Sequence, residues 1–433
     1  MKKIYEPDFG YTLVRRIANF YIRGSYRFLE YEGLENIPKD GAAIYSPNHC
    51  NTLMDPLVVL AMIRDKMVFV ARADIFKKPF LKKVFTFFRI MPINRVRDGF
   101  RSVLNVEETV EKSIEVLNNQ VPFCILPEGM HRAMHSLLPI GKGIARIAVG
   151  ADRQKKPGTH IRIVPVGCEY GDYFRYRSSL VMTVGEPIDI TAYIADHPEK
   201  SESEIFADIR KMTGEAMKCL IVYIPDDEDY DATWEIARLR SGHQVPECRP
   251  KERMKANRAE IEKIGRLREE SPEKAKGIFE KALAYGEARK RARVSTHATY
   301  TRRPVAKALW STLKALVCAP FGLAFAAVSV PIWGVGEKLA AGLKDPAFRN
   351  SFRCGVNIIV WTLLLLIAAV VLFCTVKWYW AIAALVLLLP APMLAYDWFE
   401  QVRRLASSWR YACNGSLRKQ KDELMEEMEK LDL

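Results

Sequence analysis

The sequence of 433 residues lacks the patterns that define several common protein classes. Its nine cysteines are scattered without a CxxC pair, which excludes a zinc-finger spacing and argues against a disulfide framework. The basic residues are not accompanied by the aromatic pattern of an RNA-recognition module. Residues 1–7 have neither the apolar core nor the cleavage site of a signal peptide. We therefore expect reduced thiols and a protein that faces the cytoplasm.

Positive charge is abundant. The chain has 65 Lys and Arg against 51 Asp and Glu, which gives a net charge of +14. A surplus of this size indicates an anionic partner, either a nucleic acid or an anionic membrane surface. Long apolar runs in the second half of the chain favour the membrane.

The stretch from Asn48 to Pro56 organises the first half of the chain. It joins an apolar run that is expected to be a strand to one that is expected to be a helix. In one interpretation His49 is a general base, and Asp55 holds its second ring nitrogen. In the other, Asp55 is the N-cap of the helix, with Pro56 at the first helical position, and His49 is an ordinary loop histidine. This stretch alone leaves both interpretations open.

Strand and helix patterns alternate from residue 33 to about residue 225. This alternation predicts an α/β fold, a mixed sheet covered by helices. The expected strands are Ala42–Ser46, Met67–Arg72, Arg89–Asn94, Phe123–Leu126, Ile161–Gly167 and Leu180–Val184. The expected helices are Leu57–Met62, Ile75–Phe87, Phe100–Asn118, Lys142–Val149 and Glu202–Val222.

Further candidate binding residues follow the expected strands. Arg95 and Arg97 would point to the same face, where two guanidinium groups suit a phosphate; ion pairs with surface carboxylates are the alternative. Glu128 would accept hydrogen bonds from hydroxyl groups or hold an arginine, and Gly129 permits a tight turn. Lys142 begins a helix after a glycine and would face an anion.

Two further patterns are considered and set aside. His131 and His135 are four residues apart, like a metal-binding pair, but no glutamate follows His131 in the arrangement of a zinc protease, and Pro139 soon ends any helix. We therefore expect no metal site. Cys50 lies beside His49, but neighbouring side chains of an extended segment point apart, so Cys50 is not expected to act as a nucleophile.

In their order and spacing, these stretches resemble the glycerophosphate and lysophosphatidate acyltransferase family over roughly residues 30–190. That family has a histidine and an aspartate a few residues apart, then an arginine block, a Pro-Glu-Gly block and a Val-Pro-type strand, here Val164–Val166. The resemblance implies that His49 is the base and Asp55 its partner. It implies in the same way that Arg95 binds the acceptor's phosphate, and that Glu128 with Gly129 positions the acceptor.

The sequence departs from the family pattern in two places. Five residues separate His49 from Asp55, whereas four are common in the family. The longer spacing resembles a subgroup that contains fungal glycerol-phosphate acyltransferases and related bacterial proteins. In addition, Met130 and His131 follow the Pro-Glu-Gly block in place of Thr-Arg, so Arg97, Arg132 or Lys142 would supply the missing positive charge.

The composition suggests five regions along the chain. Residues 226–303 are highly charged and are expected to form a solvated helical region, whose basic cluster Arg289–Arg293 would contact anionic lipid headgroups. The N-terminal helix would lie in a bilayer interface or pack on its own domain. The regions are an N-terminal amphipathic helix (1–32), an α/β acyltransferase domain (33–225), the charged helical region (226–303), a membrane region (304–400) and a cytoplasmic amphipathic tail (401–433).

The membrane region is expected to contain a helical hairpin, residues 356–376 and 378–396, with Lys377 at its tip. Basic residues flank both ends, which places both ends in the cytoplasm. The segment 315–335 is interrupted by Pro320 and Pro331 and is also basic on both sides, so we expect it to enter the membrane and return. A single kinked span is the alternative.

The residues and the resemblance together predict a membrane-bound O-acyltransferase of phospholipid biosynthesis, with its catalytic domain on the cytoplasmic face. The donor would be acyl-CoA or acyl carrier protein, and the acceptor lysophosphatidate or glycerol 3-phosphate. No metal or cofactor is expected to take part, and anionic membrane lipids are the expected partners. The alternative is a catalytically silent membrane protein that binds anionic lipid or a partner through its basic helices.

Overall fold

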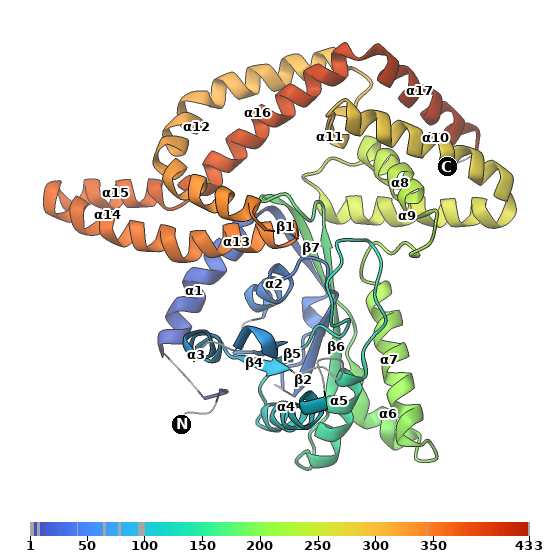
Figure 1. The fold of residues 1–433 in the computed structure, drawn as a ribbon, viewed down its shortest axis with the longest axis vertical. Coiled ribbons are helices and arrows are strands. Elements are labelled where there is room, and N and C mark those ends of the chain that lie inside the picture. The colour runs from blue at the N-terminus through green and yellow to red at the C-terminus, as the bar shows by residue number, and fades with distance from the viewer. Residues whose placement is uncertain are drawn as a thin grey trace. The chain divides into compact units, whose positions relative to one another are not determined.

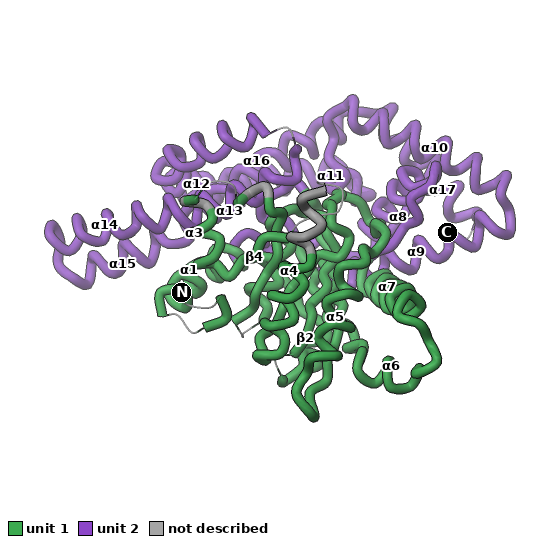
Figure 2. Tube along the Cα trace, turned by 60° about the horizontal axis from the view of Figure 1, so that its bottom comes forward, with its two compact units in different colours: residues 1–23, 29–173, 180–221 green, residues 24–28, 174–179, 222–433 purple. Residues whose placement is uncertain are grey.

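The structure is a computed structural model that describes residues 4–6, 9–40, 42–63, 66–76, 79–93, 100–343 and 345–431. Its internal contacts divide the chain into two compact units, which Figure 2 shows in green and purple. Unit 1 consists of residues 1–23, 29–173 and 180–221, and unit 2 of residues 24–28, 174–179 and 222–433.

Unit 1 is built on a mixed sheet, drawn with its helices in Figure 1. The strand order is β1-β7-β6-β2-β5-β3-β4, and β8 pairs with β6. Strands β6, β2, β5, β3 and β4 run parallel, whereas β7 and β8 are antiparallel to β6. This confirms the predicted α/β class. The strands are β1 (Tyr26–Glu32), β2 (Ala43–Pro47), β3 (Val68–Arg72), β4 (Ile90–Ile93), β5 (Phe123–Cys124), β6 (Arg162–Tyr170), β7 (Ser178–Val184) and β8 (Ile188–Asp189).

Helices cover the sheet, and for this reason its parallel strands are apolar along their length. Every residue of β2 is buried, as are all residues of β6 but the first. Helices α4, α5 and α7 pack on the sheet through one continuous apolar core. The helices of unit 1 are α1 (Phe9–Gly24), α2 (Met54–Met62), α3 (Pro79–Phe87), α4 (Phe100–Asn118), α5 (Lys142–Gln154), α6 (Ile190–Asp196) and α7 (Glu202–Lys218).

The N-terminal segment differs from the prediction. The expected helix ends at Gly24, and Tyr26–Glu32 is strand β1, paired with β7. Helix α1 also packs on its own unit: Arg15 donates to the carbonyl of Leu60 (3.1 Å), and Arg23 donates to that of Ala61 (2.9 Å). These carbonyls belong to the last turn of α2, where cations favourably meet the helix dipole. Contact of α1 with a bilayer stays a prediction.

Unit 2 is helical and has a core of its own. Helices α8, α9 and α10 pack together with α17, and their apolar residues form one cluster. The predicted solvated helical region is therefore wrong in this respect, because the chain's last helix covers its apolar positions. The helices are α8 (Tyr230–Gln244), α9 (Pro250–Glu270), α10 (Pro272–Arg291), α11 (Thr296–Thr299), α12 (Pro304–Ala341), α13 (Phe348–Val356), α14 (Thr362–Thr375), α15 (Trp378–Leu388), α16 (Ala391–Cys413) and α17 (Gly415–Lys430), with a π-helical turn, η4, at Asn357–Trp361.

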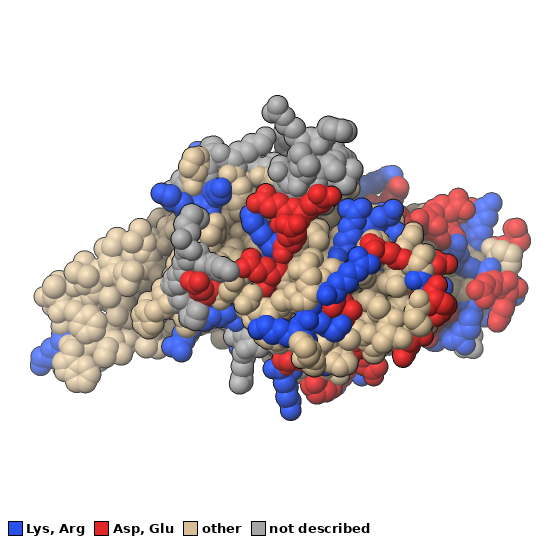
Figure 3. Space-filling view, turned by 90° about the horizontal axis from the view of Figure 1, so that it is seen from below, with Lys and Arg blue, Asp and Glu red and all other residues tan. Residues whose placement is uncertain are grey.

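In the described part of the chain, two helices are long and apolar enough to cross a membrane: α12, and the continuous helix Phe348–Thr375. Helices α15 and α16 would add a third span if the bent pair forms one crossing. Figure 1 shows α14 and α15 at the left of the picture. In Figure 3 the surface on this side is almost free of charged side chains. Between Gly355 and Tyr396 the sequence has one charged residue, Lys377.

Two predictions about this region are corrected. Residues 315–335 do not turn back but belong to the single 38-residue helix α12, which contains Pro320 and Pro331. Each proline lacks the N–H that would bond the carbonyl four residues earlier, Leu316 for Pro320 and Ala327 for Pro331, yet the helix continues through both. The predicted helix 378–396 is broken at Pro390, where α15 and α16 meet at 43°.

Candidate active site

The candidate site lies where the parallel strands of unit 1 end. His49 follows the end of β2, Glu128 follows β5, and Tyr170 is the last residue of β6. The register pairs Pro47 of β2 with Val166 of β6. Because these strands are parallel and adjacent, their carboxyl ends meet at one edge of the sheet, which is the usual ligand-binding edge of open α/β sheets.

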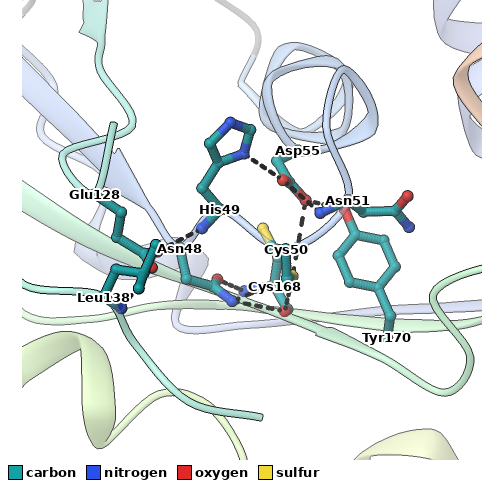
Figure 4. A network of polar contacts seen from close by, with 9 residues as sticks. All are labelled: Asn48, His49, Cys50, Asn51, Asp55, Glu128, Leu138, Cys168 and Tyr170. Atoms are coloured by element: carbon teal, nitrogen blue, oxygen red, sulfur yellow. Dashed lines mark hydrogen bonds and ion pairs between the residues drawn. The ribbon is translucent and has the colours of Figure 1, made fainter. Parts of the chain in front are cut away.

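His49 and Asp55 form a hydrogen-bonded pair at this edge (Figure 4). The distance from His49 Nδ1 to Asp55 Oδ2 is 2.8 Å. The side chain of Asp55 is fully buried, whereas that of His49 is 16% exposed. The carboxylate is therefore shielded from water while the imidazole can be reached from outside. Its other nitrogen, Nε2, has no hydrogen bond to any residue in the described part of the chain.

Asp55 is fixed by two more donors. The hydroxyl of Tyr170 donates to Oδ1 (2.8 Å), and the backbone N–H of Asn51 donates to Oδ2 (2.8 Å). Asp55 lies in the first turn of α2, where the helix dipole stabilises a negative charge. It is not the N-cap, which is Leu53, so the alternative interpretation of Asp55 is wrong on this point.

Glu128 fixes the backbone of His49 by accepting its N–H as a hydrogen bond. Its Oε1 accepts the N–H of His49 (2.6 Å), and its Oε2 accepts the N–H of Leu138 (2.8 Å). Burial raises the pKa of Glu128 to about 7, although the two N–H donors act in the opposite direction. A carboxylate that accepts two backbone donors fixes the position of the loop and leaves less of its capacity for a substrate.

The turn between β2 and α2 is locked to β6. The side chain of Asn48 accepts the N–H of Cys168 (2.7 Å) and donates to its carbonyl (3.2 Å). After β2 has ended, the side chain of Asn48 thus makes hydrogen bonds to the backbone of β6 in place of the backbone of β2. Thr52 has φ +49°, a left-handed conformation that is strained for a β-branched residue. Backbone strain of this kind is concentrated at functional sites.

Cys50 is next to His49 but is not placed to react. Its side chain is 2% exposed, and burial raises the pKa of its thiol well above the ordinary value. The neighbouring carboxylates raise it further, that of Asp55 first among them. Because the thiolate is the nucleophilic form, these surroundings oppose a covalent acyl-cysteine.

The other predicted residues are less closely connected with the pair. Gly129 has φ +66°, so a tight turn follows Glu128 as expected. Lys142 begins α5 and is exposed; the preceding residue, Gly141, donates to the carbonyl of Pro127 (2.8 Å). Arg95 and Arg97 lie outside the described residues. The site residues that the structure brings together are thus His49, Asp55 and Glu128.

His131 and His135 make contacts with different residues. The ring of His131 lies 5.5 Å from that of His49, centroid to centroid. His135 is buried, with its Nδ1 3.1 Å from Oε1 of Glu169 and 3.2 Å from the hydroxyl of Tyr173. The described residues contain no group of three metal-binding side chains.

Tyr170 is the site residue that sequence reasoning missed. It is separated from Asp55 by 115 residues, and only the pairing of β6 with β2 brings it near. The available signal was a hydroxyl-bearing residue at the carboxyl end of a strand that is otherwise apolar. Neither periodicity nor the family pattern drew attention to that position.

Comparison with known proteins places His49, Asp55 and Glu128 within a segment that matches a protein family. Residues 28–169 match the model of the Acyltransferase family. Glycerol-3-phosphate O-acyltransferase 2 of Saccharomyces cerevisiae is 28% identical over 142 residues, 33% of this chain and 19% of the yeast protein. Glycerol-3-phosphate O-acyltransferase 1 of the same yeast is 27% identical over 117 residues, 27% of this chain and 15% of that protein.

Among solved structures, the 1-acyl-sn-glycerophosphate acyltransferase PlsC of Thermotoga maritima is 20% identical, with a TM-score of 0.35; the match covers 48% of this chain and 79% of that one. The family model supports the predicted resemblance over residues 28–169. The chain spans less than a fifth of the length of the two yeast relatives. The subgroup defined by five residues between His49 and Asp55 stays a prediction.

Proposed function

We propose that the protein is a membrane-bound O-acyltransferase. It would transfer a fatty acyl group from a thioester, either acyl-CoA or acyl carrier protein, to a hydroxyl group of lysophosphatidate or glycerol 3-phosphate. The observation that carries this proposal is the 2.8 Å contact between His49 and Asp55, at the carboxyl edge of the sheet and within the segment that matches the Acyltransferase family.

His49 is the general base in this mechanism. An ionised carboxylate can only accept a hydrogen bond, so Asp55 holds the proton of His49 on Nδ1 and leaves Nε2 as the acceptor. Nε2 removes the proton from the acceptor's hydroxyl as its oxygen attacks the thioester carbonyl. The C–O bond forms, the C–S bond breaks, and the imidazolium returns the proton to the departing thiolate. The products are an ester and a free thiol.

The contacts around the pair support this role because they fix both partners. Tyr170 and the N–H of Asn51 hold the carboxylate, and Glu128 holds the backbone of His49. A base that is held in place needs no reorganisation when the hydroxyl arrives, and positioning of this kind contributes strongly to rate. Glu128 thereby becomes a positioning residue, where the resemblance implied contact with the acceptor.

The acceptor and the carrier of the donor are both anionic, which gives the basic residues near the site a purpose. We propose Arg95, Arg97 and Lys142 as phosphate-binding residues, and Gly129 as the residue that shapes the turn after Glu128. The apolar helices of unit 2 would hold the catalytic unit at the cytoplasmic surface of the membrane, where the amphiphilic product is released.

An acceptor panel tests the proposal. Purified protein in detergent is given radiolabelled acyl-CoA with lysophosphatidate, glycerol 3-phosphate, lysophosphatidylcholine or glycerol. We expect transfer to lysophosphatidate or glycerol 3-phosphate at a rate at least tenfold above that to glycerol, because only the phosphate-bearing acceptors gain a charge-assisted contact of about 1.4 kcal/mol or more. Repetition with acyl carrier protein identifies the donor. Absence of transfer to every acceptor from both donors would show that the proposal is wrong.

A further inference from the structure

Unit 2 contains a basic cavity that plays no part in the proposed reaction. It has a volume of about 450 Å³ and lies between the segment that precedes α12 and the first turns of α17. Four basic side chains line it, from Arg302, Arg418, Lys419 and Lys421. This volume is sufficient for a phosphate-bearing headgroup.

The acidic residues of the cavity do not cancel its charge. Asp422, Glu423 and Glu426 also line it, but their side chains are 74%, 62% and 66% exposed. Each is near a lysine: Asp422 lies 3.6 Å from Lys421, Glu423 lies 3.7 Å from Lys419, and Glu426 lies 2.9 Å from Lys430. With these pairs accounted for, the guanidinium groups of Arg302 and Arg418 remain as donors for a ligand.

The surroundings of Lys421 show a deficit of negative charge. Its side chain is buried, with Nζ 3.3 Å from the carbonyl of Thr301. Burial lowers the pKa of Lys421, Asp422 acts in the opposite direction through its charge and a side-chain hydrogen bond, and the charge of Arg302 lowers the pKa further. A buried ammonium group is costly unless an anion accompanies it. Asp422 is the neighbouring carboxylate, but its side chain is 74% exposed and its charge is screened by solvent, so a bound anion would stabilise this cluster further.

The surroundings of His243 show the same excess of positive charge. Nε2 of His243 in α8 is buried and has no hydrogen-bond partner among the described residues. Burial lowers the pKa of His243 to about 4, and Lys421 and Arg302 contribute next in size. Arg302, just before α12, and Lys421, in α17, are far apart in the sequence. Both therefore place positive charge near His243 in unit 2.

The cavity is also at a suitable depth for a lipid headgroup. Trp310 is 66% exposed, six residues into α12, and Trp409 of α16 donates to Thr312 of α12 (3.0 Å). Tryptophans at the start of an apolar span mark the membrane interface. Pro304, which lines the cavity, precedes Trp310 by about 9 Å of helix. The cavity is therefore at the polar end of α12.

We propose that this cavity binds the phosphate of an anionic phospholipid headgroup, held by Arg302, Arg418 and Lys421. Lipid contact by the basic cluster Arg289–Arg293 stays a prediction for its exposed members, Lys290, Arg291 and Arg293. In the structure Arg289 is buried and paired with Glu235 (3.2 Å), so it is committed to the helical core. The chemistry recognised is a phosphate group, which a lipid or a soluble phosphate compound could carry.

Native mass spectrometry of the full-length protein in detergent tests the proposal. Phosphatidylglycerol and phosphatidylcholine are titrated separately onto wild type, Arg302→Gln, Arg418→Gln and the double variant. Arg303→Gln is the matched control, since Arg303 is adjacent and exposed but does not line the cavity. Arg302→Lys and Arg418→Lys keep the charge. A parallel arm measures protection from thermal unfolding by inorganic phosphate.

We expect each glutamine variant to bind phosphatidylglycerol about tenfold more weakly, and the double variant at least 30-fold, since a charge-assisted hydrogen bond contributes about 1.4 kcal/mol or more. The lysine variants and Arg303→Gln should stay within about threefold of wild type, and phosphatidylcholine should bind weakly throughout. Equal losses in Arg303→Gln would overturn the proposal, as would unchanged binding in the double variant. Protection by inorganic phosphate equal to that by lipid would assign the site to a soluble compound and overturn the lipid assignment.

Discussion

Each unit contains a polar network, and the two differ in how their charged groups are paired. Around His49 in unit 1, three donors converge on the buried Asp55, while one imidazole nitrogen is left without a described partner. Around Glu247 in unit 2, arginines and carboxylates pair throughout. Arg175 and Arg404 both donate to Glu247 and to Glu400.

The network in unit 2 is structural by this comparison. Burial alone would raise the pKa of Glu247, but Arg175 and Arg404 hold it far below its usual range. A second pair, Arg177 with Asp397 (2.7 Å), extends the network, and the same guanidinium donates to two backbone carbonyls. A network in which arginines share their carboxylate partners stabilises a fold. A network that holds one reactive group rigidly and leaves it accessible is prepared for chemistry.

The largest expected effect comes from removing the charge of Asp55. In Asp55→Asn the side-chain amide cannot replace a carboxylate that accepts from His49, Tyr170 and the N–H of Asn51. The imidazole then loses its fixed tautomer, and we expect kcat for acyl transfer to fall by about 10²–10⁴-fold. Steady-state kinetics with the best acceptor measures this, and a fall of less than threefold would show that Asp55 does not support the base.

The matching change in unit 2 is Glu247→Ala, which should act on stability. It removes one of the two carboxylates, Glu247 and Glu400, to which Arg175 and Arg404 both donate, and loss of this largely buried partner is expected to cost roughly 2 kcal/mol. Thermal unfolding in detergent should show a clear decrease. Glu252→Ala removes an exposed pair with Arg249 and should change little. Equal unfolding temperatures for the two variants would contradict the structural role.

A smaller effect is expected from Tyr170→Phe, which removes one of the donors to Asp55. We predict a decrease in kcat of about tenfold with an unchanged KM for the acceptor, because Tyr170 acts on the carboxylate and not on the substrate. Tyr173→Phe is the control, since its hydroxyl contacts His135. If both variants lose activity equally, or if KM alone rises, Tyr170 is not a positioning residue for the pair.

The smallest effect concerns the pH dependence of stability. The pKa of folded Glu128 is about 7, above its ordinary value of 4.5, so the folded protein retains this proton when the unfolded chain has lost it. Its contribution to stability is therefore largest at low pH and decreases as the pH rises from about 4.5 to 7. Glu128→Gln should lack this component, so its unfolding temperature should fall less over that interval. Parallel curves for both proteins would contradict the assignment.

The sequence sufficed to predict the parts of the fold that follow local patterns. Strands β2, β3, β4 and β6 and helices α4 and α7 are found where apolar periodicity placed them. Strand β1 was missed because its charged residues alternate with apolar ones and were taken for the continuing face of a helix. The π-helical turn at Asn357–Trp361 has no counterpart in any local pattern.

Of the contacts in the candidate site, only the one between residues close in sequence could be predicted. His49 and Asp55 lie six residues apart, so one turn of chain brings them together. The contacts of Tyr170 with Asp55, and of Glu128 with the backbone of His49, span 115 and 79 residues. They depend on strand register, which a single sequence does not reveal. The same reason applies to α17, whose apolar stripe was visible but whose partner helices were not.

The catalytic role of His49 is the central claim, and the kcat of His49→Ala tests it most directly. His131→Ala is the matched control, because it removes a neighbouring imidazole whose ring lies 5.5 Å from that of His49, centroid to centroid, and leaves the contact between His49 and Asp55 in place. We predict that His49→Ala loses at least about 10³-fold in kcat with unfolding unchanged, whereas His131→Ala stays within tenfold. Near-wild-type turnover by folded His49→Ala would contradict the account.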